Sequence, residues 1–153
     1  YKGNADWKQI SEVKNNPRMH IPVFGNGDVN SPEMARLMRD DYGLDGAMIG
    51  RASIGNPWFF KQVKEYLEMG SIASEPLLEE RIYTAKRHLE MAIKWKGEML
   101  GLLETRRHYS NYFRGIANFK PYRTRLVTGD TVEEVMEVFK ELEQKKASFE
   151  VIV

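Results

Sequence analysis

The stretch IPVFGNGDVNSPEMARLMRDDYGLDGAMIGRASIGNPWFF, residues 21–60, decides the fold. It holds two short apolar runs, at 22–25 and 47–49. Between them, Ser31 followed by Pro32 predicts the start of a helix, because serine caps free amides and proline is tolerated at the first helical position. Two short buried strands joined by one helix form a parallel unit, so this stretch indicates α/β structure.

Each apolar run ends in a loop that contains glycine. Parallel strands end at the same edge, and (β/α) barrels often build phosphate sites there from their last two loops. Glycine lets backbone N–H groups approach an anion, arginine adds a charge-assisted contact, and a short helix at 52–54 would present its positive end. Either glycine alone is equally consistent with an ordinary turn. The pair favours a phosphate site formed by Asn26, Gly27, Asp28, Gly50 and Arg51.

Two of these side chains are expected to act in different ways. The carboxylate of Asp28 repels phosphate, so we expect this residue to offer its backbone N–H while its side chain orients the loop. For Arg51, the backbone is the surer contact, and the guanidinium is an additional one.

The stretch resembles the flavin-phosphate half of the tRNA-dihydrouridine synthases, most closely the bacterial B-type branch. Other FMN barrels share the two glycine loops, but not the GNPWFF segment followed by a helical tail. The resemblance therefore implies the last two strand–helix units of a TIM (β/α)8 barrel, followed by an all-α C-terminal helical bundle. It is carried by YKGNADW at 1–7, IPVFGNGDV at 21–29, DGAMIGRAS at 45–53, GNPWFF at 55–60 and Arg106-Arg107-His108.

The resemblance also implies an activity for the whole enzyme. In the family, NADPH reduces FMN, the reduced flavin delivers hydride to C6 of a uridine in tRNA, and a cysteine protonates C5. That cysteine lies upstream of the region that this chain resembles, and the chain contains no cysteine. We therefore expect no catalytic residue here, and a fragment that is inactive alone. The uridine that is modified and the oligomeric state stay open.

Beyond residue 60 the apolar spacing becomes helical. A stripe of apolar residues predicts one long helix that ends at Gly97, and Leu100 and Leu103 open another that runs to about Phe113. Thr131 and Glu134 have the spacing of a capping box and start the last helix. We predict an FMN-binding part at 1–70 and a helical tRNA-binding domain at 71–153. The long helix is expected to begin near Ser74-Glu75-Pro76 and to bury Leu78, Ile82, Ala85, Leu89, Ala92 and Trp95.

The candidate RNA-binding segment is RRHYSNYFRGIANFKPYRTR, residues 106–125, which has six basic residues, no acidic residue and five aromatic residues. Basic side chains contact phosphates, and aromatic rings stack on unpaired bases. From the residues alone, an ordinary basic surface with its aromatics turned inward is equally favoured. The resemblance favours binding to tRNA through Arg106, Arg107, His108, Tyr112, Lys120, Arg123 and Arg125.

Composition narrows the classes of partner and site that remain for this chain. The 153 residues carry a net charge of +1, so nucleic acid would be attracted by a local patch only. Without cysteine there is no thiolate metal site, and we predict no metal and no membrane partner. A cytoplasmic protein is the default. Two alternatives stay open: another FMN-dependent TIM-barrel oxidoreductase that acts on a small molecule, and a stand-alone RNA-binding helical module.

Overall fold

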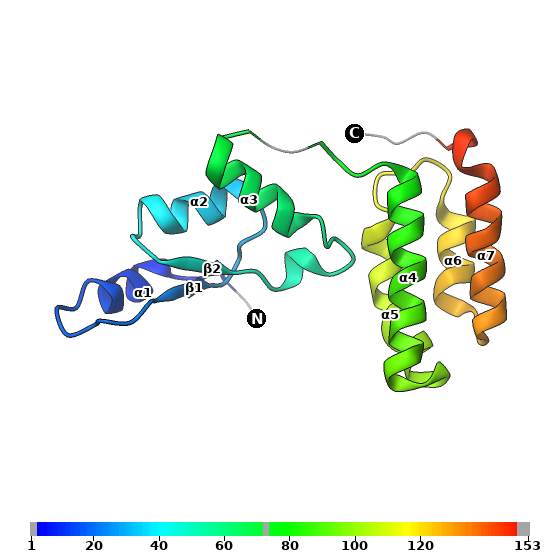
Figure 1. Cartoon of the computed structure of the whole chain (residues 1–153), viewed down its shortest axis with the longest axis horizontal. Coiled ribbons are helices and arrows are strands. Elements are labelled where there is room, and N and C mark those ends of the chain that lie inside the picture. The colour runs from blue at the N-terminus through cyan, green and yellow to red at the C-terminus, as the bar shows by residue number, and fades with distance from the viewer. Residues whose placement is uncertain (1–2, 72–73, 150–153) are drawn as a thin grey trace. The chain divides into compact units, whose positions relative to one another are not determined.

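The computed structural model describes residues 3–71 and 74–149, which form two compact units that divide between Ser74 and Glu75 (Figure 1). We call the described residues up to Ser74 the sheet unit and those from Glu75 onward the helical unit. Each unit is described by itself.

The sheet unit contains one parallel pair of strands with a helix between them. The register pairs Phe24 with Gly46 and Asn26 with Met48, so both strands end at the same edge. The predicted parallel pair is therefore confirmed, although the strands lie one or two residues from the expected positions. The elements are α1 (Trp7–Lys14), β1 (Phe24–Asn26), α2 (Pro32–Asp40), β2 (Gly46–Met48), the 3-10 turn η1 (Arg51–Ser53) and α3 (Phe59–Met69).

Local capping explains where these helices begin and end. Asp6 accepts a hydrogen bond from the amide of Lys8 at 3.1 Å, which caps α1. Ser31 accepts from the amide of Met34 at 3.4 Å, with Pro32 at the first position of α2, as expected. Gly70 ends α3 with φ of 70°, a left-handed conformation that glycine adopts without strain.

The core of the sheet unit lies on one face of the sheet only. Gly25 points into it so closely that an added Cβ would come within 2.5 Å of Leu44. The alternate residues point away, and Phe24 is 64% exposed and Met48 60% exposed. The sheet therefore has one covered face and one bare apolar face. The buried apolar side chains are Trp7, Val29, Ala35, Met38, Leu44, Phe59 and Val63.

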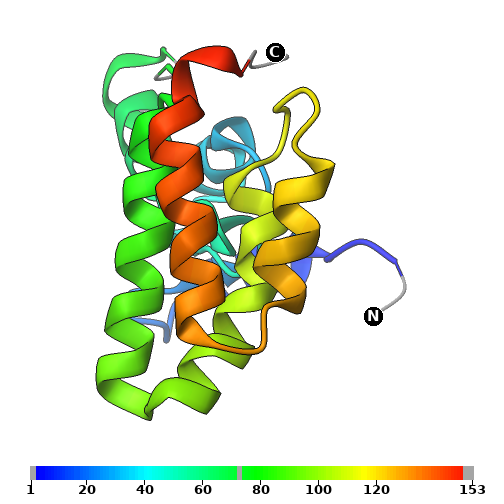
Figure 2. The same cartoon turned by 90° about the vertical axis from the view of Figure 1, so that its right-hand side faces the viewer.

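The helical unit places four helices side by side (Figure 2). Its core holds the largest fully buried side chains, among them Tyr109, Phe113 and Phe139, each completely inaccessible to solvent. Thr131 accepts from the amide of Glu134 at 3.2 Å, which confirms the predicted capping box. The elements are α4 (Leu78–Lys96), α5 (Glu98–Tyr112), α6 (Lys120–Thr128), α7 (Val132–Lys145) and the 3-10 turn η2 (Lys146–Ser148).

A buried arginine ties the start of the helical unit to the end of α5. The guanidinium of Arg81 donates to the carbonyl of Pro76 at 3.0 Å and to the carbonyl of Arg114 at 2.9 Å, and it contacts Glu75 at 3.3 Å. Arg81 is only 6% exposed, and these bonds satisfy its buried charge.

Two expectations about α4 are wrong. The helix begins at Leu78 rather than near Ser74-Glu75-Pro76, and the carboxylate of Glu80 accepts from the amide of Leu77 at 3.0 Å at its start. The predicted apolar stripe is buried as far as Leu89, but Trp95 is 80% exposed. The physical reason is visible in Figure 2, where the turn between α4 and α5 extends past the ends of α6 and α7.

The apolar end of the chain, residues 149–153, falls partly outside the described residues. The ring of Phe149 lies 5.9 Å from that of Phe119 and 5.4 Å from that of Tyr122, so the tail begins by packing on α6. Residues 150–153 lie outside the described part of the chain. Among the described residues, no helix combines the length and apolar character needed to cross a bilayer.

Candidate functional site

The loops that follow β1 and β2 form the first candidate site. Because the two strands are parallel and in register, Asn26-Gly27-Asp28 and Gly50-Arg51 leave the sheet at the same edge. A guanidinium nitrogen of Arg51 lies 2.8 Å from a carboxylate oxygen of Asp28, which joins the two loops directly. The structure thus brings all five predicted phosphate-site residues together.

Asp28 orients its loop, as the sequence predicts. Its second carboxylate oxygen accepts from the amide of Ala5 at 2.7 Å, and its own φ is 54°, a left-handed conformation. One carboxylate therefore holds the segment before α1, its own loop and Arg51. The ion pair also offsets the charge that Arg51 would bring to an anion.

The first residue of α1 and the segment before it support the loop at a second point. The indole of Trp7 donates to the carbonyl of Gly27 at 3.0 Å, and an added Cβ on Gly27 would come within 2.5 Å of the Cβ of Ala5. Gly27 also has φ of 104°. Trp7 is buried, and its role with Ala5 in positioning this loop was not predicted from the sequence. The sequence signal for these contacts was Ala5-Asp6-Trp7 in the motif YKGNADW.

The two glycines differ in what surrounds them. The amide of Gly27 donates to the side chain of Asn26 at 2.8 Å, so this N–H is already engaged. At Gly50 an added Cβ would meet nothing within 4 Å, so space beside this backbone is open. The amide and hydroxyl of Ser53 both donate to the Gly50 carbonyl, which closes η1. The expected helix at 52–54 is thus a single 3-10 turn, too short for an appreciable dipole.

The second candidate site is the basic segment of the helical unit, where most of the aromatic rings are buried. Tyr112 is only 4% exposed, and its hydroxyl lies 3.2 Å from Nδ1 of His88. The prediction that Tyr112 contacts RNA is therefore wrong, because its position on α5 faces the core. Tyr109, Phe113 and Phe119 are buried in the same way.

Two of the predicted RNA-binding arginines are engaged within the unit. Arg106 donates to the carbonyl of Gly129 at 2.5 Å and lies 3.4 Å from Asp130. Arg125 makes two hydrogen bonds with the carboxylate of Glu141, at 2.8 and 2.6 Å. Both arginines support the packing of the end of α6 against its neighbours.

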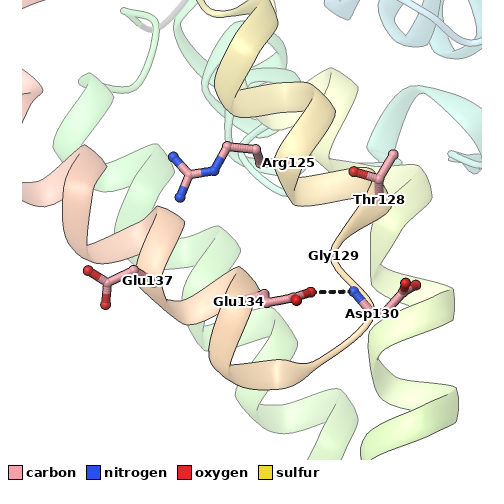
Figure 3. A pocket seen from close by; sticks show the side chains of 6 residues that line it. All are labelled: Arg125, Thr128, Gly129, Asp130, Glu134 and Glu137. Carbon is pink, nitrogen blue, oxygen red and sulfur yellow. Dashed lines mark hydrogen bonds between the residues drawn. The ribbon is translucent and has the colours of Figure 1, made fainter.

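The surface beside Arg125 is acidic. A cavity of about 490 Å³ lies at the junction of α6 and α7. Figure 3 shows its lining residues and the hydrogen bond from the amide of Asp130 to the carboxylate of Glu134, which is 2.8 Å long. Three carboxylates and one arginine surround it, which disfavours phosphate there. Its lining residues are Arg125, Thr128, Gly129, Asp130, Glu134 and Glu137.

The other predicted residues lie at the surface of α5 and α6. Arg107 and Lys120 are exposed, and Arg123 is half-buried. The ring of His108 packs edge-on against that of His88 on α4, with centroids 4.6 Å apart. Burial, with the charges of His88 and Arg107, lowers the pKa of His108 to about 4. Burial, with the charges of Arg107 and Lys96, also lowers the pKa of His88, so both rings are neutral at pH 7.

One known family matches the chain across both candidate sites. The family model for dihydrouridine synthases matches residues 1–150, which include the glycine loops and the basic segment. The chain belongs to the dihydrouridine synthase family.

Individual relatives bear this out and favour the B-type branch. The tRNA-dihydrouridine synthase B of Pseudomonas putida is 35% identical over 125 residues, covering 82% of this chain and 36% of the relative. The tRNA-dihydrouridine synthase B of Shewanella oneidensis is 38% identical over 112 residues, or 73% of this chain and 34% of the relative. A probable tRNA-dihydrouridine synthase of Rickettsia conorii is 35% identical over 123 residues, or 80% of this chain and 37% of the relative.

The chain spans about a third of the length of the curated relatives it matches. The resemblance seen in the sequence is confirmed, and these relatives are named as tRNA-dihydrouridine synthases. The two-stranded sheet matches only part of the TIM-barrel fold that the family implies.

Proposed function

We propose that this chain is the C-terminal part of an FMN-dependent tRNA-dihydrouridine synthase. In this proposal, residues 1–70 complete the cofactor-binding barrel and residues 71–153 form the tRNA-binding helical domain. The observation that carries it is the meeting of two glycine loops at one edge of a parallel sheet, in a chain of this family.

The bare face of the sheet supports the assignment to a barrel. In a (β/α) barrel, helices cover the outer face of each strand, and side chains on the inner face pack against other strands. Here Gly25 faces the helices, whereas Phe24 and Met48 are exposed on the other face. We propose that these side chains point into the interior of the complete barrel.

The loops fit a phosphate group. Open space lies beside the backbone of Gly50, and Arg51 stands next to it. Arg51 uses one nitrogen for Asp28, and its guanidinium has further N–H donors for a phosphate oxygen. Asn26 and Asp28 hold the first loop in shape. We propose that Gly50 and Arg51 contact the phosphate, while Asn26, Gly27 and Asp28 form the wall beside it.

The chemistry itself depends on groups outside this sequence. When bound, FMN supplies the reducing equivalents from NADPH that saturate the C5=C6 bond of a tRNA uridine. The protonating cysteine that the resemblance implies is absent from this chain. The chain's own residues are proposed to hold the phosphate end of the cofactor and to bind tRNA, so the chain alone is expected to be inactive.

For tRNA binding, the structure narrows the proposed set of residues. Exposed Arg107 and Lys120 and half-buried Arg123 remain available for phosphate contacts, with His108 beside Arg107. Arg106 and Arg125 act first within the unit, through Gly129 and Glu141. The acidic cavity next to Arg125 supports placing RNA on the side of Arg107 instead.

A chimera tests the cofactor part of the proposal. The chain is joined behind the N-terminal two thirds of the Pseudomonas putida relative, and the purified protein is examined for FMN absorbance and for dihydrouridine in unmodified tRNA by mass spectrometry. We expect FMN to be retained, and the FMN Kd to rise about tenfold in Arg51→Ala through loss of a charge-assisted contact. Arg18→Ala, an exposed arginine in the same unit, is the matched control.

A folded chimera that holds no FMN would contradict the phosphate site. The tRNA part has a separate readout, which is binding of unmodified tRNA to the chain at several salt concentrations. Arg107→Ala with Lys120→Ala should weaken binding and flatten its salt dependence, whereas Lys140→Ala on acidic α7 should not. Equal effects of the two sets would contradict the proposed RNA surface.

A further inference from the structure

An exposed tryptophan stands at the end of α4. Trp95 is 80% exposed, and exposed apolar side chains surround it in sequence: Met91 at 49%, Met99 at 76% and Leu100 at 52%. The junction of α4 and α5, near which these residues lie in the sequence, extends beyond α6 and α7 (Figure 2). Apolar side chains gathered in this way mark a contact surface rather than scattered exposure.

The basic surface around Arg107 reaches this end of α4. Nε of Arg107 lies 3.3 Å from Nε2 of His108, and the His108 ring packs on that of His88. Arg107 and Lys96 both lie close enough to His88 to disfavour its protonation. The surface therefore spans both helices, whereas the RNA contacts predicted from the sequence lie only within residues 106–125.

Trp95 continues that surface along α4. It follows His88 by seven residues, which is about two helical turns, so both side chains lie on nearly the same face of the helix. Trp95 is also the most exposed aromatic side chain in the described helical unit, whose other large rings mostly lie in the core. An indole at the end of a basic surface has the chemistry of a stacking platform for an unpaired base.

The charges near Trp95 attract RNA only weakly. Lys94 and Lys96 flank it in the sequence, and Lys96 is paired with Glu104 on α5. Glu90 and Glu98 are also exposed on this pair of helices. Binding at this end should therefore depend on the ring more than on charge, and it should be less sensitive to salt than binding at Arg107.

We infer that Trp95 is a stacking site for an unpaired base of the RNA, at the end of a surface that runs from Arg107 across His108 and His88. This inference rests on the proposed tRNA-binding function and adds α4 to it. Met91, Met99 and Leu100 provide the apolar surroundings that exclude water from the stacked ring.

The test compares tRNA binding by the 153-residue chain and three variants, with unmodified tRNA as the probe. Trp95→Ala should raise Kd by about 5- to 100-fold, the usual range for losing one stacked base. Trp95→Phe should keep most of the affinity. Tyr83→Ala, which removes an aromatic ring 60% exposed on the same helix, is the control and should leave Kd unchanged.

Tryptophan fluorescence gives a readout that would not change if Trp95 had only a structural role. A base stacked on Trp95 should quench part of the emission, and this quenching should vanish in Trp95→Phe although RNA stays bound. The chain has two further tryptophans, Trp7 and Trp58, whose emission serves as the internal reference.

The possible results separate the two proposals. Unchanged affinity in Trp95→Ala, with weakened binding in the Arg107→Ala/Lys120→Ala double variant described above, overturns the stacking site and leaves the tRNA-binding proposal standing. If the wild-type chain does not bind tRNA, although circular dichroism shows that its helices are folded, both proposals are overturned. Self-association in sedimentation that Trp95→Ala abolishes, with unchanged RNA affinity, overturns the inference in favour of contact with a second copy.

Discussion

The sheet unit packs its buried side chains on one face of two strands, whereas the helical unit encloses its buried side chains among four helices. In the sheet unit, Phe24 and Met48 remain 64% and 60% exposed. In the helical unit, Phe113 and Phe139 are fully buried. Burial of apolar surface is the main favourable term in folding, so the comparison separates a unit that can fold alone from one that requires additional chain.

The largest expected effect follows from separating the units. Residues 75–153 produced alone should unfold cooperatively, because their core needs no other part of the chain. Residues 1–74 alone should lack a cooperative transition, because one face of the sheet stays uncovered. Thermal and urea unfolding followed by circular dichroism measures both. A cooperative transition in residues 1–74 would contradict the proposed difference between the two units.

Matched phenylalanines sharpen the comparison within the chain. Phe139→Ala should lower the free energy of unfolding of the helical unit by about 3–5 kcal/mol, through lost burial and the cavity left behind. Phe24→Ala in the same chain should change stability by less than about 0.5 kcal/mol, because its ring is mostly exposed. Urea denaturation gives both values.

The same Phe24→Ala change should become costly in the chimera. If the bare face packs inside a complete barrel there, the loss should rise to about 3 kcal/mol. An equally small effect in the chain and in the chimera would contradict the assignment of this face to a barrel interior.

The two loop glycines should differ by a smaller amount. Gly27→Ala in the chimera should cost about 1–3 kcal/mol, because Gly27 has φ of 104° and its Cβ would meet Ala5. Gly50→Ala should cost less than about 0.5 kcal/mol, since its Cβ would enter open space, but it should weaken FMN binding. Thermal unfolding and FMN titration measure the two effects separately. FMN affinity unchanged in Gly50→Ala would place the phosphate elsewhere.

The smallest expected effect is that the two units lose stability over different ranges of pH. The pKa of His108 falls from 6.5 to about 4 on folding, so the unfolded chain binds its proton more tightly. Stability from this group is complete above pH 6.5 and is lost progressively between pH 6.5 and 4. The midpoint of thermal unfolding of the helical unit should fall by a few degrees between pH 7 and 5. His108→Gln should reduce that fall, and an identical fall in this variant would assign the effect to other groups.

The sheet unit should respond at lower pH. There the contact with Lys14 and the hydrogen bond from the amide of Val23 hold the pKa of Asp45 below its ordinary value of 3.8. A carboxylate with a lowered pKa contributes stability that is present above its ordinary pKa and is lost as the pH falls below it. In the chimera, where the sheet unit is expected to be complete, Asp45→Asn should therefore lower stability above about pH 4, and its difference from the parent chimera should disappear as the pH falls below that value.

Local signals in the sequence predicted most helices and the pair of strands. Ser31-Pro32 and the capping box at Thr131 mark helix starts through contacts within one turn, which need no tertiary information. The separate helix α6 was missed, because its nine residues have no clear apolar stripe and only Pro121 marks its start. Short helices of this kind are stabilised by packing, and packing is not visible in local spacing.

The arrangement of the candidate phosphate-site residues was easier to predict than the exposure of the candidate RNA-binding residues. Its five residues lie in two loops whose positions follow from strand direction alone. The RNA surface depends on which side of each helix faces the core, and there the sequence misled for Tyr112 and Trp95. Tyr112 and Trp95 both belong to regular apolar spacings. Whether each side chain is buried depends on how far the neighbouring helices extend.

The two strands of the sheet also have consequences for how this chain behaves in a cell. Within the described residues, β1 and β2 pair only with each other, so each has an outer edge whose backbone N–H and C=O groups can pair with another strand. Open edges beside a bare apolar face promote aggregation and recruit chaperones and proteases. Produced without the rest of a barrel, the chain is therefore expected to accumulate as inclusion bodies or to be trimmed back to its helical unit.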